Sequence, residues 1–213
     1  MLQLSEDKNY HENRARIVLC DVLKFEKERL IREDKPDLQY DTDAIGIEVV
    51  FDCYENEQAN TAFVDKYYKS PISAIPCNKL RNYQARGGTY VLENGLFIPR
   101  SLGSSTPNNP EHLIETIKKK VDLINKGHYT RFASYCLYVR VDTVSPLYPS
   151  YVCEVISEIN EYITSQDYQI KYDTIYLDGW YEIIVCDMNS GSYEKYSISR
   201  ELQNRIHDEL SYS

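Results

Sequence analysis

Two acidic residues, Asp37 and Glu48, have the surroundings that most indicate chemistry in this sequence. Asp37 follows Pro36, and Glu48 is the only charged residue between Ala44 and Phe51. An ionised carboxylate in such an apolar segment is costly unless it is paired, hydrogen-bonded or bound to a metal ion. Two converging carboxylates bind Mg²⁺ or Mn²⁺ through hard oxygen ligands, and such an ion activates water and neutralises charge on a phosphodiester. The pair therefore predicts a divalent-metal site.

The elements that must position this pair are predicted by periodicity. Residues 9–31 have apolar side chains at helical spacing, and a Lys-Pro step then stops the helix, because proline excludes the preceding residue from the α region. Residues 37–41 and 44–51 are predicted as two short strands, the second with apolar residues alternating on one face. A tight hairpin between these strands would bring the two carboxylates to one end of a sheet.

Strand and helix patterns alternate along the rest of the chain. Further helices are predicted at residues 55–69, 110–126 and 151–164 and from residue 199 on, with further strands at 132–141, 173–177, 181–186 and 193–198. An Asn94-Gly95 step between two apolar runs indicates a β-hairpin within a region rich in Gly and Pro. We therefore expect one α/β domain over residues 1–213, with a mixed central sheet flanked by helices and an inserted loop and hairpin region at about residues 70–108.

The order of helix, Pro-Asp, hairpin and Gly46-Ile47-Glu48-Val49 resembles the PD-(D/E)XK nuclease superfamily, which has the restriction-endonuclease-like fold. Lys35-Pro36-Asp37 before this segment is similar to a branch of small bacterial proteins with the same motif pair. The resemblance covers residues 9–51. The helix 110–126 and the strand 132–141 would complete an α-β-β-β-α-β core, whose first strand the sequence does not place. The resemblance implies a metal-dependent nuclease, with Mg²⁺ or Mn²⁺ held by Asp37, Glu48 and the carbonyl of Val49.

The position two residues after the second acid departs from the pattern of this family. The signature has a lysine there, which orients the attacking water and stabilises charge, whereas this chain has Val50. In the superfamily the lysine can come from a neighbouring element, and Lys118 and Lys120 flank core-facing positions of the predicted helix 110–126. These two lysines are the catalytic candidates. The alternative is that both are solvated together with Lys119, as most charge runs are.

Each acidic candidate also has a structural alternative. Glu12 in the first helix is a third metal ligand, as in some members of the superfamily, or an acid favoured by the helix dipole. Asp37 is a metal ligand or a turn residue after proline. Glu48 is a metal ligand or a buried carboxylate paired with an arginine such as Arg14 or Arg16. The sequence leaves these alternatives open.

The predicted insertion combines basic and aromatic side chains. Its basic residues include Lys79, Arg81, Arg86 and Arg100, and tyrosines stand among them. Such a combination grips a phosphate backbone and stacks on bases, so DNA is the expected partner and these four residues are the expected contacts. The alternative is an ordinary exposed loop.

The composition limits the classes of protein that fit. Lys and Arg total 24 against 33 Asp and Glu, a net charge of −9, which argues against holding nucleic acid by bulk positive charge. The six cysteines stand singly, without the C-x-x-C spacing of zinc ribbons and redox sites. No apolar run approaches the roughly 20 residues of a membrane helix, and no secretory signal is recognisable. We therefore expect a soluble, cytoplasmic protein.

Two functions of different classes fit the sequence. The first is a divalent-metal-dependent nuclease of low activity that hydrolyses DNA. The second is a catalytically inactive relative that binds a protein or a nucleic acid with the same scaffold. The acid pair favours the first function, and Val50 favours the second.

Overall fold

A mixed sheet of seven strands forms the centre of the main part of the structure and includes Glu48 and Val49. Its order is β1 (Leu30–Arg32), β2 (Leu38–Tyr40), β3 (Ile45–Asp52), β6 (Ser134–Val141), β7 (Thr174–Asp178), β8 (Glu182–Asp187) and β9 (Ser192–Ser197). The three central strands β3, β6 and β7 are parallel to one another, and the other neighbours pair antiparallel. The expected α/β fold with a mixed sheet flanked by helices is confirmed.

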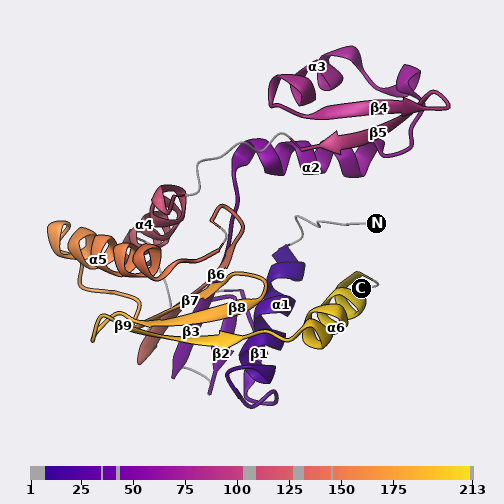
Figure 1. Cartoon of the computed structure of the whole chain (residues 1–213). Coiled ribbons are helices and arrows are strands. Elements are labelled where there is room, and N and C mark those ends of the chain that lie inside the picture. Colours follow the sequence, from indigo (N-terminus) through magenta and orange to yellow (C-terminus); the bar gives the residue numbers. More distant parts are fainter. Residues whose placement is uncertain are drawn as a thin grey trace. The chain divides into compact units, whose positions relative to one another are not determined.

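Helices cover both faces of this sheet (Figure 1). Along β3, Ile47 and Val49 belong to the core cluster shared with α1 (Lys8–Asp21) and α6 (Arg200–Ser211). Val50 instead packs against the cluster under α4 (Glu111–Lys126) and α5 (Pro149–Ser165). Because successive strand residues point to opposite faces, Glu48 and Asp52 share the α4 face with Val50.

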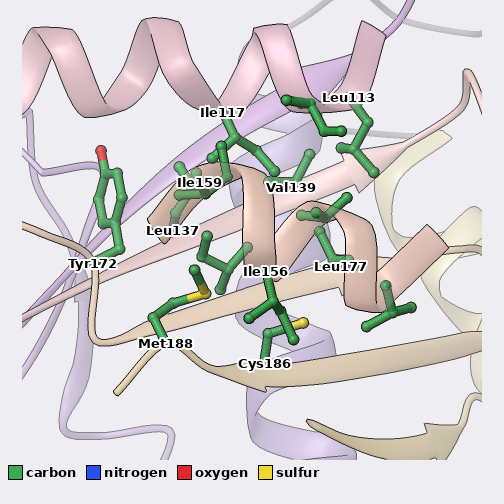
Figure 2. Close-up of a cluster of buried hydrophobic side chains, with 14 of the residues drawn as sticks. Leu113, Ile117, Leu137, Val139, Ile156, Ile159, Tyr172, Leu177, Cys186 and Met188 are labelled. Atoms are coloured by element: carbon green, nitrogen blue, oxygen red, sulfur yellow. The ribbon is translucent and has the colours of Figure 1, made fainter. Parts of the chain in front are cut away.

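The core on the α4 face is aliphatic and closely packed. Figure 2 shows Ile117 of α4 and Ile156 of α5 over the sheet residues Leu137, Val139 and Leu177. Four of these five side chains are fully buried and Ile156 is 5% exposed. Full burial of such a side chain contributes about 1.5–3 kcal/mol, so this layer fixes the position of α4 on the strand of Glu48.

The computed structural model describes residues 8–34, 36–41, 44–102, 109–126, 132–144 and 146–211. Lys35 of the motif therefore lies outside the described residues. The described chain forms two compact units, a main unit built on the sheet and an inserted unit that starts at Cys53. The inserted unit is larger than the expected insertion at about residues 70–108, because the helix α2 (Glu55–Tyr67) belongs to it.

The inserted unit has an aromatic core of its own. It contains α2, the 3₁₀ turn Ile72–Ala74, α3 (Cys77–Ala85) and the hairpin of β4 (Thr89–Glu93) and β5 (Leu96–Ser101). The rings of Phe63 and Tyr83 stack with centroids 4.8 Å apart, and Phe97 packs edge-on against both. The hairpin predicted at Asn94-Gly95 is present, with both residues at positive φ as a two-residue turn requires.

The N-terminal region differs from the sequence-based expectation. The helix expected over residues 9–31 ends at Asp21, and Leu30–Arg32 forms strand β1. Lys24 has a φ of 63°, which reverses the chain, and Leu30 is fully buried opposite Tyr40. The apolar residues after Asp21 thus pack on the sheet from a turn. The sequence did not predict this strand.

Candidate functional site

Asp37 and Glu48 both lie at the open end of the β2–β3 hairpin. The ladder ends at Leu38, which pairs with Ile47, so Asp37 directly precedes the paired residues of β2 and Glu48 directly follows those of β3. Asp37 is 2% exposed, and its Oδ2 accepts a hydrogen bond of 2.8 Å from the backbone N–H of Val49. The structure therefore holds the Asp37 carboxylate against β3, at the residue that follows Glu48.

Lys120 forms an ion pair with Glu48. Its Nζ donates to Oε1 of Glu48 at 2.7 Å, and the two side chains are only 20% and 12% exposed. The lysine comes from α4, which packs over β3, while Val50 contributes to the apolar contact with α4 and α5. A positive charge thus stands beside the acid although position 50 lacks one.

The other partners suggested for Glu48 are engaged elsewhere. Arg14 bonds to Asp178, and Arg16 donates to the carbonyls of Leu30 and Lys27. Both arginines lie on α1, on the face of the sheet opposite to Glu48. The arginine alternative for Glu48 is therefore wrong, because the sheet separates the groups.

The neighbouring lysines of α4 do not join the site. Lys118 contacts Glu115 and Glu158 at 3.4 and 3.5 Å and lies over the ring of Tyr162. These contacts direct it toward α5. Lys119 is exposed. The helical periodicity of α4 therefore selects Lys120 from the run of three.

Glu12 is separated from the two other acids. Its Oε2 accepts from Arg32 of β1, with Nη2 at 2.7 Å, and its side chain is 5% exposed. Glu12 belongs to α1, which covers the opposite face of the sheet from Glu48. The expectation of a third acidic metal ligand at this position is corrected, because Glu12 forms an ion pair that joins α1 to β1.

The donor set of the site consists of two carboxylates. Among the residues that the structure describes, no group of three or more His, Cys, Asp and Glu is arranged to hold a metal ion. Mg²⁺ is commonly bound through one or two carboxylates and keeps several waters, so Asp37 and Glu48 fit this ion better than one that needs a complete protein cage. A contact of the Val49 carbonyl with a metal stays a prediction.

The four basic residues proposed for nucleic acid have different surroundings. Lys79 and Arg81 are exposed on α3. Arg86 is half-buried, with Nε donating to Oδ1 of Asn60 at 2.7 Å. Arg100 lies 3.7 Å from Glu93 across the hairpin. Arg86 therefore stabilises the inserted unit, while the exposed Lys79, Arg81 and Arg100 can contact a ligand.

Sequence reasoning missed a polar cluster at the carboxyl end of β3. Asp52 is fully buried, and its oxygens contact Nδ1 of His112 at 2.8 Å, Thr116 Oγ1 at 2.9 Å and Thr143 Oγ1. His112, Thr116 and Lys120 follow at four-residue intervals along α4. The four-residue spacing on a helix, together with an acidic residue at the end of a buried strand, is the sequence pattern from which this cluster could have been predicted.

Comparisons of the chain with family models, with curated proteins and with solved structures find no match. Within the described ranges, no helix has the length and apolarity needed to cross a membrane.

Proposed function

We propose that this protein is a divalent-metal-dependent nuclease that hydrolyses phosphodiester bonds of DNA at Asp37 and Glu48. The observation that carries the proposal is the 2.7 Å contact between Lys120 and Glu48. It supplies the cation that the nuclease signature requires and that Val50 cannot provide. The lysine that the signature has on the strand would thereby come from the helix packed above it.

The connectivity of the main unit supports a restriction-endonuclease-like fold. The order α1, β1, β2, β3, α4, β6 is the α-β-β-β-α-β order that the resemblance implies. The first three strands form an antiparallel meander, and α4 crosses over to β6, which pairs parallel with β3. The acid pair lies in this meander, beneath α4.

The two acids and the lysine have different roles in the proposed reaction. Asp37 and Glu48 would hold Mg²⁺ or Mn²⁺, which lowers the pKa of water and neutralises charge on the phosphodiester when bound. Asp37 is oriented by the Val49 N–H, so one of its oxygens is fixed against β3. Lys120 places a positive charge where negative charge develops on the phosphate oxygens, and such preorganised charge is a main source of rate enhancement.

The inserted unit supports DNA as the substrate. Cys53–Pro107 contains six Lys and Arg and four Asp and Glu, a net charge of +2 in a chain of net −9. The exposed Lys79 lines a groove between α2 and α3 together with Lys66 and the rings of Phe63 and Tyr67. Basic side chains interleaved with aromatic rings suit a nucleic-acid strand.

The proposal is tested by incubating purified protein with linear and circular DNA in Mg²⁺, in Mn²⁺ and in EDTA. We expect cleavage with either metal, none with EDTA, and none with Asp37→Asn. Asparagine keeps an oxygen that can accept from Val49, so the variant should fold while losing the charge that binds the ion. Equal trace cleavage by the native protein and Asp37→Asn would identify a contaminant and remove the proposal.

One observation favours the alternative of an inactive binding protein. Both carboxylates already have partners within the chain, Asp37 with the Val49 amide and Glu48 with Lys120. In an inactive relative these two contacts would only stabilise the β2–β3 hairpin and its packing against α4. Titration of Mn²⁺ into the native protein separates the two cases, because only the nuclease requires an ion that the Asp37→Asn and Glu48→Gln variants fail to bind.

A further inference from the structure

A second charged cluster is buried on the opposite face of the sheet from Glu48. Arg14 of α1 and Arg140 of β6 are each 1% exposed, and Asp178 at the end of β7 is fully buried. Arg140 lies in register between Phe51 of β3 and Asp178. The first turns of α1 cover this row, since His11 stacks on Phe51 and Arg14 bonds to Asp178.

The carboxylate of Asp178 is occupied by Arg14 and its neighbours. Oδ2 accepts from Arg14 Nε at 2.6 Å and from the hydroxyl of Tyr138 at 2.7 Å. Oδ1 accepts from Arg14 Nη2 at 2.9 Å and from the backbone N–H of Trp180 at 3.2 Å. The nearest approach of Arg140 to these oxygens is 3.7 Å, from Nη1. Asp178 is therefore shared by the two arginines, more closely with Arg14, and the three buried groups keep a net positive charge.

Arg140 is incompletely satisfied. Its Nη1 donates to the carbonyls of Asp178 and Val141 at 2.7 and 3.3 Å. Its Nη2 is buried and has no hydrogen-bond acceptor among the residues that the structure describes. Burial lowers the pKa of the Arg140 guanidinium. A buried N–H group of a charged side chain without an acceptor is destabilising, so an anionic acceptor at Nη2 would stabilise the protein.

An aromatic ring, a helix and a further carboxylate surround Arg140. The half-buried ring of Trp180 lies 3.8 Å from the Arg140 guanidinium and 5.0 Å from that of Arg14, and stabilises both cations. The site lies under the first turns of α1, where the helix dipole stabilises negative charge. The exposed carboxylate of Asp142 accepts from Trp180 Nε1 at 3.4 Å, and its charge partly offsets the lowering of the Arg140 pKa by burial.

We propose that an oxyanion of the phosphate class binds at Nη2 of Arg140, between the first turns of α1 and the carboxyl ends of β6 and β7. Arginine and a helix N-terminus together present donors that match the several oxygens of a phosphate group. The ligand is either free orthophosphate or the terminal phosphate of a nucleotide chain. This site is independent of the proposed nuclease site, because the sheet lies between them.

The sole tryptophan of the chain is Trp180, so its fluorescence reports on this site. Native protein in EDTA is titrated with orthophosphate at constant ionic strength, with chloride and acetate as controls. We expect a saturable change in emission with phosphate alone. At about 100 times the dissociation constant, phosphate should raise the melting temperature by roughly 5–10 °C. No saturable response to phosphate, or an equal response to acetate, would overturn the proposal.

Variants of Arg140 test whether the change in Trp180 emission comes from phosphate bound at this residue. Arg140→Met should abolish it, and the exposed control Arg200→Met should retain it. Arg140→Met should also be no less stable than the native protein in phosphate-free buffer, since a buried charge with an unsatisfied N–H group is removed and Asp178 keeps Arg14 as its partner. If Arg140→Met does not fold, Arg140→Lys serves instead. Lysine keeps the positive charge but lacks the planar guanidinium with its paired N–H donors, so this variant should bind phosphate more weakly. An unchanged response in the folded Arg140 variants would place the ligand elsewhere and contradict the proposal.

The source of the phosphate is distinguished with a 5′-phosphorylated oligonucleotide and the same oligonucleotide without phosphate. Tighter binding of the phosphorylated form than of orthophosphate identifies a chain terminus as the ligand, and the reverse identifies free phosphate. The Asp37→Asn variant should behave like the native protein in both titrations. A loss of nuclease activity and a loss of phosphate binding are therefore separable results.

Discussion

At the scale of single residues, Lys120 distinguishes the proposed nuclease from an inactive scaffold. Replacement by Met should lower the DNA-cleavage rate about 100-fold, because one preorganised group that stabilises developing charge is lost. Lys119→Met is the matched control, since the adjacent lysine is exposed. The measurement is initial cleavage rate at saturating Mg²⁺ with both variants folded by circular dichroism. Equal rates for the two variants would show that Lys120 serves only the ion pair with Glu48.

The acid pair was predictable from the sequence, but its cation and its neighbours were not. A single charged residue, Glu48, in an otherwise apolar strand indicates a functional site. The choice among three consecutive lysines depends on the rotation of α4, which is set by packing of residues such as Ile117 on the sheet. Glu12 looked equivalent to the other acids because a sequence does not show which face of the sheet a helix covers.

At the scale of elements, hydrogen bonds of Asp122 join α4 to α5 and to the loop that follows α5. Its carboxylate bonds to Lys126, and its Oδ1 accepts from the hydroxyls of Tyr162 and Tyr168 at 2.7 and 2.8 Å. These hydrogen bonds, that of Lys126 first, lower the pKa of Asp122 to about 2. The contact thus helps to hold the helix that carries Lys120.

This carboxyl gives a pH prediction. A folded pKa of about 2 lies below the ordinary value of 3.8, so the stabilisation is present above pH 3.8 and is lost as the pH falls through about 2. Carboxyl NMR titration should give Asp122 a pKa near 2 in the native protein and a higher value in Tyr162→Phe and Lys126→Met. A native pKa at the ordinary value would show that the contacts with Lys126, Tyr162 and Tyr168 do not form in solution.

The elements of the sheet were largely predictable, and the failures have physical reasons. The alternation in β3 is clear because Ile47 and Val49 pack on the α1 face while Glu48 and Asp52 lie on the other, and the helical stripe of α4 is clear because that helix buries one continuous face. The short strand β1 was not predicted because its apolar residues are also compatible with a helix. Its extended conformation is determined by pairing with β2, which a local sequence pattern does not show. Helix α3 was missed because Tyr83 is its only buried residue, so the sequence carries little periodicity.

At the scale of the whole molecule, the two units have separate hydrophobic cores and should respond separately to core mutations. Phe97→Ala should destabilise the inserted unit by about 3–5 kcal/mol, while the thermal transition of Trp180 in the main unit stays unchanged. Hydrogen exchange should show lost protection in α3, β4 and β5. Leu137→Ala in the main core is the control and should lower the Trp180 transition. Joint loss in Phe97→Ala would show that the units fold as one.

The charge of the inserted unit predicts where DNA binds. Lys79→Gln with Arg81→Gln should weaken DNA binding at low salt and leave the melting temperature nearly unchanged, because exposed charges contribute little to stability. Arg86→Gln is instead expected to destabilise the inserted unit, since the Asn60 contact is lost. Binding is measured by fluorescence anisotropy of a labelled oligonucleotide. Unchanged binding in the Lys79 and Arg81 double variant would exclude these residues as the DNA contact.

The central claim is that Asp37 and Glu48 share one divalent ion. The most direct measurement is anomalous diffraction from crystals of the native protein soaked in Mn²⁺. We expect one strong peak within about 2.5 Å of a carboxylate oxygen of both residues, and no such peak in Asp37→Asn crystals. Occupied Mn²⁺ sites elsewhere with no peak between Asp37 and Glu48 would contradict it.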